Sequence, residues 1–401
     1  MKIQQSSPHS RLVGIFCGIP GLLWIRSVDG REGLNYSCFF AFCPRMRLSK
    51  TNGGHTLGIL KYDGHDGPIP RLSVVIPVYN GEATIADCLK SIVSQDTPFD
   101  FEVIVADSSE DSTAAIVETE FPQVRLLRLG GRAFPGTARN AAIREARADL
   151  LAMIDADCIA APDLLLRLVD AHDTTGYAAV GGAICDGTPE SASGLIGYLL
   201  EFREFIPSSP RREVFTIPTA NICYRRDVFE RFGLFDDVRA SEDLLYNWRL
   251  SIAGEQILFD PTIKVTHQNR TGWKKVITYQ RTLGKSSALA RHRMNPPFEV
   301  IRAYPALGWL MPYLIRHPWL GVLVPPVRLA RALVWLARYD LKLFFKLLVL
   351  SPGYLAGAYM WASAFVRALR EVRDAERAAP TEKLAPRTIE RPEHTTTAGQ
   401  R

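Results

Sequence analysis

The stretch Leu150-Leu151-Ala152-Met153-Ile154-Asp155-Ala156-Asp157 decides how the rest of this sequence is interpreted. Its apolar part is short and is bounded by polar sequence typical of helices, a pattern that predicts a buried strand. The strand ends in two carboxylates, Asp155 and Asp157. In open parallel sheets, ligands bind outside the carboxyl ends of the strands. The two acids can therefore share a cation such as Mg²⁺, which uses one or two carboxylates plus phosphate oxygens, or can be turn and helix-cap residues.

Strands and helices alternate before this stretch. β-branched runs end in turn residues, and helical spacing of apolar residues follows each of them. This alternation predicts βαβ units and a parallel sheet with right-handed crossovers, hence an α/β fold. A mixed α/β part is expected from about 191 to 267, packed on the first part and closing a cleft. Strands are predicted at 72–78, 101–106, 124–129 and 150–154, and helices at 82–95, from 109 to 120 and at 136–147.

Composition and charge restrict the class of partner. The 401 residues leave room for two domains, and 47% hydrophobic with 22% charged residues is ordinary for a globular protein. The net charge of +6 is unevenly distributed, because residues 261–346 hold 15 Lys and Arg against two acids. Such a segment predicts an anionic partner: nucleic acid, a membrane surface or a phosphorylated substrate. The seven cysteines form no C-x-x-C pair, which favours buried thiols in a reducing compartment.

The two ends of the chain carry the weakest patterns. Residues 1–70 are predicted to be a poorly ordered extension, and Met46 is one candidate start of the functional protein. The apolar run at 12–25 is too short to cross a bilayer comfortably. Residues 370–401 are charged and rich in Pro and Thr, and are predicted to be a disordered tail.

Residues 271–369 are predicted to form a basic, helical, membrane-associating region. Within it, 327–346 reads as one amphipathic helix, and at 100° per residue its five cations fall within about 80° of one face. That pattern is typical of a helix in a membrane interface with cations toward the headgroups, although a solvated basic stripe gives the same pattern. Residues 347–366 carry no charge and can span, re-enter or lie in the interface. The five cations are Arg328, Arg331, Arg338, Lys342 and Lys346.

Several motifs, taken in order, resemble the GT-A glycosyltransferases of family 2 over about residues 71–270. The first half carries Ser73-Val74-Val75-Ile76-Pro77-Val78-Tyr79-Asn80, Asp107-Ser108-Ser109, Gly136-Thr137-Ala138-Arg139-Asn140 and Asp155-Ala156-Asp157. The second half carries Ala220-Asn221-Ile222-Cys223-Tyr224-Arg225-Arg226, Phe232-Gly233-Leu234-Phe235-Asp236, Ser241-Glu242-Asp243, Trp248-Arg249 and His267. The resemblance implies a mixed sheet flanked by helices, with a nucleotide-sugar half at 71–160 and an acceptor half at 161–270.

The resemblance also implies roles for individual residues. Asp243 would be the base that deprotonates the acceptor hydroxyl in an inverting transfer from a nucleoside-diphosphate sugar, and Glu242 would orient loops or the acceptor. The metal ligands would bind Mg²⁺ or Mn²⁺, and the cation would stabilise the leaving diphosphate. The implied metal ligands are Asp155, Asp157 and His267, and the implied donor-binding residues are Pro77, Val78, Tyr79, Asn80, Glu82, Asp107, Arg139 and Asp155.

Each of these residues also has a purely structural interpretation. Asp107 can be a turn or cap residue, and Arg139 can form an ion pair on a helix surface. Glu242 and Asp243 can cap the helix that follows them, and a single histidine after a strand is more often structural than a ligand. The segment Gln280-Arg281-Thr282-Leu283-Gly284 does not fit the Gln-x-x-Arg-Trp element of processive relatives, which favours transfer of a single sugar.

Other classes of function fit less well. A nucleotidyltransferase should carry a basic residue in a Gly-rich loop after the first strand, and a dinucleotide-dependent oxidoreductase needs G-x-G-x-x-G there; neither is present. A non-catalytic, membrane-associated scaffold with a transferase fold is the remaining alternative. The expected partners are a UDP- or GDP-type donor, a glycan or lipid acceptor and an anionic membrane surface rather than nucleic acid. The expected location is the cytoplasmic face of a membrane, through residues 303–366.

Overall fold

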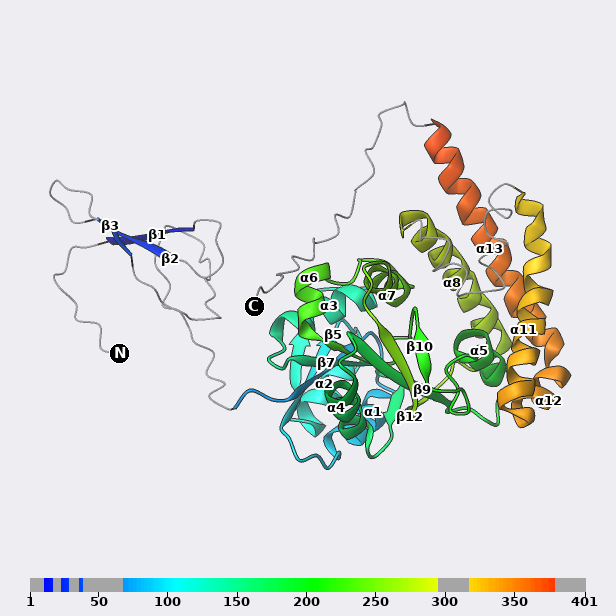
Figure 1. The fold of residues 1–401 in the computed structure, drawn as a ribbon, viewed down its shortest axis with the longest axis horizontal. Helices are drawn as coiled ribbons and strands as arrows, with labels where there is room; N and C mark the ends of the chain where they lie inside the picture. The colour runs from blue at the N-terminus through cyan, green and yellow to red at the C-terminus, as the bar shows by residue number, and fades with distance from the viewer. Residues whose placement is uncertain (1–10, 17–22, 29–35, 39–67, 295–316, 379–401) are drawn as a thin grey trace, which may run out of the picture. The chain divides into compact units, whose positions relative to one another are not determined.

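The computed structural model describes residues 11–16, 23–28, 36–38, 68–294 and 317–378 (Figure 1). The chain divides into two units, 1–67 and 68–401. In the first unit, β1 (Arg11–Phe16), β2 (Leu23–Val28) and β3 (Tyr36–Cys38) form an antiparallel sheet. The predicted extension at 1–70 and the predicted tail at 370–401 lie mostly outside the described residues.

Across the described part of the second unit, nine strands form one mixed sheet. Its parallel half consists of β7 (Leu150–Ile154), β4 (Leu72–Val78), β5 (Phe101–Asp107) and β6 (Arg125–Arg128), in that order. The predicted α/β fold is confirmed. The carboxyl ends of β4 and β5 lie level, since Val78 pairs with Asp107.

Alternate residues of the parallel strands enter two separate apolar cores, because successive side chains of a strand point to opposite faces. In β4, for example, Val74 and Ile76 face one core and Val75 faces the other. The first core is covered by α1 (Ile85–Val93), α2 (Thr113–Glu120), α4 (Leu164–Thr175) and α5 (Ala192–Phe202). The second is covered by α3 (Pro135–Glu145), α6 (Arg226–Phe232) and α7 (Glu242–Ile252).

The other half of the sheet brings distant residues to the end of β7. β11 (Asn221–Arg225) runs antiparallel between β7 and β9 (Ala179–Asp186), and β12 (Ile257–His267) pairs with β9. β10 (Arg212–Val214) lies at the edge, beside β12. The short β8 (Cys158–Ala160) also pairs with β12, and this register sets His267 opposite Cys158. The chain therefore returns to the Asp155–Asp157 turn more than a hundred residues later.

Helices follow the sheet, in the order α8 (Trp273–Met294), the 3-10 helix η1 (Pro318–Leu323), α11 (Val324–Tyr339), α12 (Leu341–Val349) and α13 (Ser351–Ala378). α13 packs along α8 and also contacts α5 and α11 (Figure 1). At the closest approach a Cβ on Gly284 would lie 2.2 Å from the carbonyl oxygen of Trp361, so glycine is required there. α13 continues to Ala378, beyond the predicted start of the tail at 370. The predicted apolar run at 303–315 lies outside the described residues.

Two predictions about these helices are wrong. The expected helix at 327–346 is divided at Asp340, whose extended backbone ends α11 and whose carboxylate accepts from Leu343 N at 3.0 Å to cap α12. Its cations also do not form one outward stripe. Arg328 is buried against α5, where it donates to Leu200 O at 3.1 Å, and Arg331 lies 3.5 Å from Glu204. The helical wheel placed all five cations on one face, but only these two are turned toward the protein, whereas Arg338 and Lys342 are exposed.

One described helical stretch, Trp319–Tyr339, is long and apolar enough to cross a membrane. A third of its most apolar 18 residues are buried in the protein. α12 and α13 pass the same test only together, and they are bent by 79° at their junction. Residues 347–366 are therefore not one straight helix. A core helix of a soluble protein can pass this test too, so the finding is weak support for a membrane span.

Candidate active site

One cavity of about 730 Å³ opens where β4 and β7 end and extends to the start of α7. Most of the predicted site residues line it, and they come from both halves of the sheet. Glu82 and Asp107 do not. The lining residues among those predicted are Pro77, Val78, Tyr79, Asn80, Arg139, Asp155, Asp157, Glu242, Asp243 and His267.

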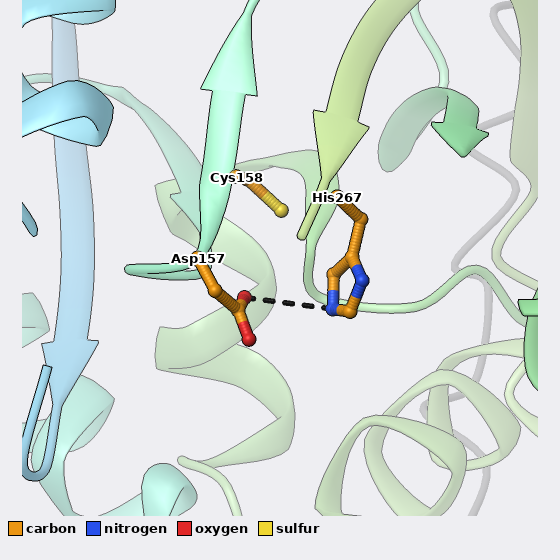
Figure 2. Close-up of side chains that lie close together, drawn as sticks. All are labelled: Asp157, Cys158 and His267. Atoms are coloured by element: carbon orange, nitrogen blue, oxygen red, sulfur yellow. Dashed lines mark ion pairs between the residues drawn. The ribbon is translucent and has the colours of Figure 1, made fainter. Parts of the chain in front are cut away.

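Asp157 faces His267 across the cavity floor. Figure 2 shows the Asp157 carboxylate directed toward the imidazole, with Nε2 lying 3.5 Å from Oδ1. Within the described part of the chain, that Oδ1 is buried and has no hydrogen-bond partner. Burial raises the pKa of Asp157. A buried acceptor without a donor costs free energy, and a bound cation would remove that cost.

The opposite side of the His267 ring is held by a short polar chain. Asn269 Nδ2 donates to Asp186 Oδ1 at 2.6 Å and to Thr188 Oγ1 at 3.0 Å, which turns its Oδ1 toward the ring. His267 Nδ1 therefore donates to Asn269 Oδ1 at 2.9 Å. In the neutral ring this leaves the Nε2 lone pair directed at Asp157, the arrangement of a metal-ligating histidine with a supporting acceptor.

Cys158 lies beside the same two residues, and one ligand atom from each of the three lies within 4.8 Å of the others (Figure 2). Its burial raises the pKa of the thiol well above its usual value, because a thiolate there would be poorly solvated. A neutral thiol is a weak ligand. The remaining ligands are a carboxylate and an imidazole. They suit a divalent cation such as Mg²⁺ or Mn²⁺ when phosphate oxygens complete its coordination.

Arg139 connects the two acidic motifs. Its side chain is 2% exposed, and it donates from Nη2 to Asp155 Oδ1 at 2.5 Å and from Nη1 to Glu242 Oε1 at 2.7 Å. Its ion pairs are buried and join the end of β7 to the start of α7, rather than lying on a helix surface. The two terminal nitrogens are committed to carboxylates, so direct contact with the donor stays a prediction.

Asp243 lies in the first turn of α7, where Ser241 takes a left-handed backbone (φ 67°) at the N-cap. Asp243 Oδ1 accepts from Leu244 N at 2.7 Å. Burial, together with the neighbouring Glu242 carboxylate, raises the pKa of Asp243 to about 7. A carboxyl with a pKa near neutral can exchange a proton with a substrate hydroxyl, which is what a general base requires.

The donor side of the cavity is built on the loop after β4. Asn80 takes a left-handed backbone (φ 54°), and its Oδ1 accepts from Glu110 N at 2.9 Å. Asp107 is 1% exposed, accepts from Ser109 N at 2.9 Å and lies 3.4 Å from Arg128 Nε. Glu82 is bonded to the start of α2 through Ser112 N. Asp107 and Glu82 are thus held by residues outside the cavity lining, so a donor-binding role for them stays a prediction.

Four cavity-lining cations were not predicted as site residues: Arg132, Arg239, Arg270 and Arg328. Arg132 lies over the Tyr79 ring at 4.5 Å and Arg270 over the Tyr279 ring at 3.8 Å. The available signal for Arg270 was its position three residues after His267. Stacked guanidiniums beside a carboxylate pair can bind an anionic ligand such as a diphosphate.

The mixed sheet ends in a carboxylate pair beside this cavity, as expected for the GT-A transferase fold. Residues 73–233 match the model of the family described as glycosyl transferase family 2. This match, together with the glycosyltransferases among the curated relatives, supports a family-2 glycosyltransferase, an enzyme that transfers glycosyl groups.

Curated relatives support the assignment over parts of the chain. This chain is 29% identical over 212 residues to the glycosyltransferase AglE of Haloferax volcanii, and the match covers 50% of this chain and 68% of AglE. It is 37% identical over 118 residues to the uncharacterized glycosyltransferase YfnE of Bacillus subtilis, covering 28% and 29%. A 34% match over 163 residues to the validoxylamine A glucosyltransferase of Streptomyces hygroscopicus covers 39% and 35%. The chain thus spans about a third of the length of two of these relatives.

Among solved structures, the fold is similar to that of the mannosyltransferase PcManGT from Pyrobaculum calidifontis, whose complex holds GDP-Man and Mn²⁺. The TM-score is 0.52 and the identity 20%, over 75% of this chain and 88% of that chain. The mixed sheet flanked by helices is thereby shown to be of the GT-A kind.

Proposed function

We propose that this protein is a metal-dependent, inverting glycosyltransferase that moves one sugar from a nucleoside-diphosphate sugar to an acceptor hydroxyl. The observation that carries the proposal is the pair Asp157 and His267, with an unsatisfied carboxylate oxygen facing an imidazole lone pair in the same cavity as Asp243. The Mn²⁺ and GDP-Man of the structural relative agree with this chemistry.

Asp155, Asp157 and His267 would hold the cation, Mg²⁺ or Mn²⁺, in this account. When bound, the cation supplies positive charge to the leaving diphosphate. Pro77, Val78, Tyr79 and Asn80 would line the nucleoside pocket, with a UDP- or GDP-type donor.

Asp243 would take the proton of the acceptor hydroxyl while that oxygen attacks the anomeric carbon from the face opposite the diphosphate. The bond from the anomeric carbon to the diphosphate oxygen breaks, and the electron pair leaves with the nucleotide, so the configuration inverts. Glu242 is held by Arg139 and would keep the start of α7, and with it Asp243, in place.

We further propose that the acceptor, a glycan or a lipid-linked molecule, is met at an anionic membrane surface on the cytoplasmic face. The support comes from apolar side chains that the C-terminal helices leave exposed: Trp319, Val322, Leu323, Val334, Leu341, Phe345, Leu348 and Val349. On α12 the stripe of Leu341, Phe345 and Leu348 runs beside Lys342 and Lys346, the arrangement of a helix lying in a lipid interface. Flotation with anionic vesicles and retention on nucleic acid are measured side by side. We expect the protein to float with the vesicles and not to be retained on nucleic acid.

The test of the transfer itself is a donor screen. The full-length protein is titrated with UDP-, GDP- and dTDP-sugars with and without Mn²⁺, and binding is followed by thermal shift and calorimetry. The account predicts that one nucleotide class binds and that Mn²⁺ tightens it. The absence of any Mn²⁺-dependent binding across the series would contradict the proposal.

A further inference from the structure

The cavity continues beyond the catalytic acids into a second compartment between the GT-A sheet and the C-terminal helices. Four helices that pack against one another supply its walls: α5, α8, α11 and α13 (Figure 1). The lining residues used below are Glu201, Tyr279, Leu283, Arg328 and Trp361. These residues line the same cavity as the loop after β4 and the start of α7.

Arg328 is a buried cation on the wall of this compartment. Its side chain is 7% exposed, Nη2 donates to Leu200 O at 3.1 Å, and the guanidinium lies 4.8 Å from the centre of the Trp361 ring. Nη1 is buried and has no partner at hydrogen-bond geometry within the described residues, although the Tyr354 side chain acts electrostatically on the guanidinium. Burial lowers the pKa of Arg328 to about 10, so it stays charged at neutral pH.

No carboxylate lies within ion-pair distance of Arg328 in the described part of the chain. Two neighbouring cations, Arg203 and Arg331, both pair with Glu204, which leaves that carboxylate already engaged. A buried charge without a counter-ion is costly, and the cost falls when an anion binds. An arginine used only to join two helices through a backbone carbonyl would not need to line a cavity.

Other features of the compartment also favour an anion. Arg270 lines the same cavity, and both Arg270 and Arg328 act electrostatically on Glu201. The acid itself accepts from Gln280 Nε2 at 3.2 Å, and burial raises its pKa to about 7, so its neutral form is accessible near neutral pH. Two guanidiniums that share one partly neutralised acid leave net positive charge in the compartment, which suits an anionic group better than a neutral one.

We propose that this compartment binds a phosphate ester carried by the acceptor, with Arg328 as the principal anion ligand. The Leu283 and Trp361 side chains would contact the part of the acceptor next to the phosphate. The inference rests on the proposed glycosyl transfer, because it places the acceptor next to Asp243. The phosphate can belong to a lipid phosphate or to a soluble polyol phosphate, and the probes below distinguish the two.

The experiment measures equilibrium binding to the full-length protein in EDTA, so that no divalent cation can bridge the phosphate. The probes are octyl phosphate below its micelle concentration, glycerol 3-phosphate, and the neutral octyl glucoside. We expect at least one phosphate probe to bind about tenfold or more tightly than octyl glucoside. Stronger binding of octyl phosphate assigns a lipid phosphate, and equal or stronger binding of glycerol 3-phosphate assigns a soluble one. Equal affinity for charged and neutral probes would overturn the proposal without any variant being needed.

The variants then locate the site. Arg328→Gln should lose about tenfold or more of the phosphate affinity, and Arg328→Lys should recover part of it. Arg367→Gln, which removes an exposed arginine of α13 outside the cavity, should bind as the wild type does. Circular dichroism melting checks that each variant is folded. Unchanged phosphate affinity in folded Arg328→Gln would remove Arg328 from this role. Mn²⁺-dependent nucleotide binding, measured in parallel, reports on the transferase proposal independently.

Discussion

Arg139 on α3 donates from Nη1 to Glu242 Oε1 on α7 at 2.7 Å, inside the protein, and thereby joins residues 103 positions apart in the sequence. The second terminal nitrogen of the same guanidinium holds Asp155 at 2.5 Å. One buried side chain therefore fixes the distance between the carboxylates at the end of β7 and the first turn of α7. We infer that donor and acceptor halves keep their relative position largely through this bridge.

The first prediction concerns that bridge. Arg139→Met leaves two carboxylates without their cation, and breaking a buried ion pair costs roughly 3–5 kcal/mol in the free energy of unfolding. Urea denaturation of the full-length protein measures the change. The control is Arg144→Met, which removes an exposed arginine near the end of the same helix. A loss below about 1 kcal/mol, the size typical of an exposed pair, would contradict the bridge as a stabilising element.

The second prediction concerns the base. Asp243→Asn should lower kcat by about two to four orders of magnitude, the usual contribution of a general base, while the donor affinity stays close to that of the wild type. Steady-state kinetics and calorimetric donor titration separate the two quantities. The control is Asp170→Asn, which changes an exposed carboxylate on α4. Full turnover in Asp243→Asn would exclude Asp243 as the base.

The third prediction is the pH dependence that follows from Asp243. Burial and Glu242 raise its pKa to about 7, and only the ionised form accepts a proton. We therefore expect kcat/KM to rise about tenfold per pH unit below that pKa and to level off above it. The same raised pKa makes the folded state less stable as pH rises through about 7, because ionising a buried carboxyl is unfavourable. A kcat/KM that is flat between pH 5 and about 8 would count against the assignment.

The fourth prediction concerns the exposed apolar stripe of α12. Replacing Phe345 and Leu348 with Glu should reduce flotation with anionic vesicles by about tenfold or more, since each buried apolar side chain contributes roughly 1.5–3 kcal/mol. Ser363→Glu adds the same charge at an exposed position of α13 and serves as the control. If the Phe345 and Leu348 variant floats as well as the wild type, this stripe is not the membrane contact.

Much of the fold could be predicted because the sequence pattern acts locally. The strand Leu150–Ile154 could be predicted because a short apolar run bounded by polar sequence is typical of a buried strand. The strand predicted at 124–129 is shorter, Arg125–Arg128, because it lies at the edge of the sheet, where β5 alone among the described strands pairs with it. Ends of elements depend on such neighbours, which a single sequence does not contain.

The site was less predictable where it depends on tertiary contacts. The helical wheel placed Arg328 and Arg331 on a common face, but only packing against α5 and Glu204 shows that these two side chains are turned toward the protein. A helix with apolar residues on one side and cations on the other has two possible orientations, and burial of the cations is the rarer one. The ion pair between Arg139 and Glu242 could not be predicted either, because no local pattern relates residues 103 positions apart in the sequence.

The most direct test of the central claim is the effect of Mn²⁺ on nucleoside-diphosphate binding, measured by titration calorimetry for the wild type, Asp157→Asn and Asp170→Asn. The account predicts that Mn²⁺ tightens binding of the preferred nucleotide by about tenfold or more in the wild type and in Asp170→Asn. It predicts little or no tightening in Asp157→Asn, because the buried carboxylate that faces His267 is gone. Equal Mn²⁺-dependent affinity in Asp157→Asn and the wild type would contradict the proposal that these residues hold the cation.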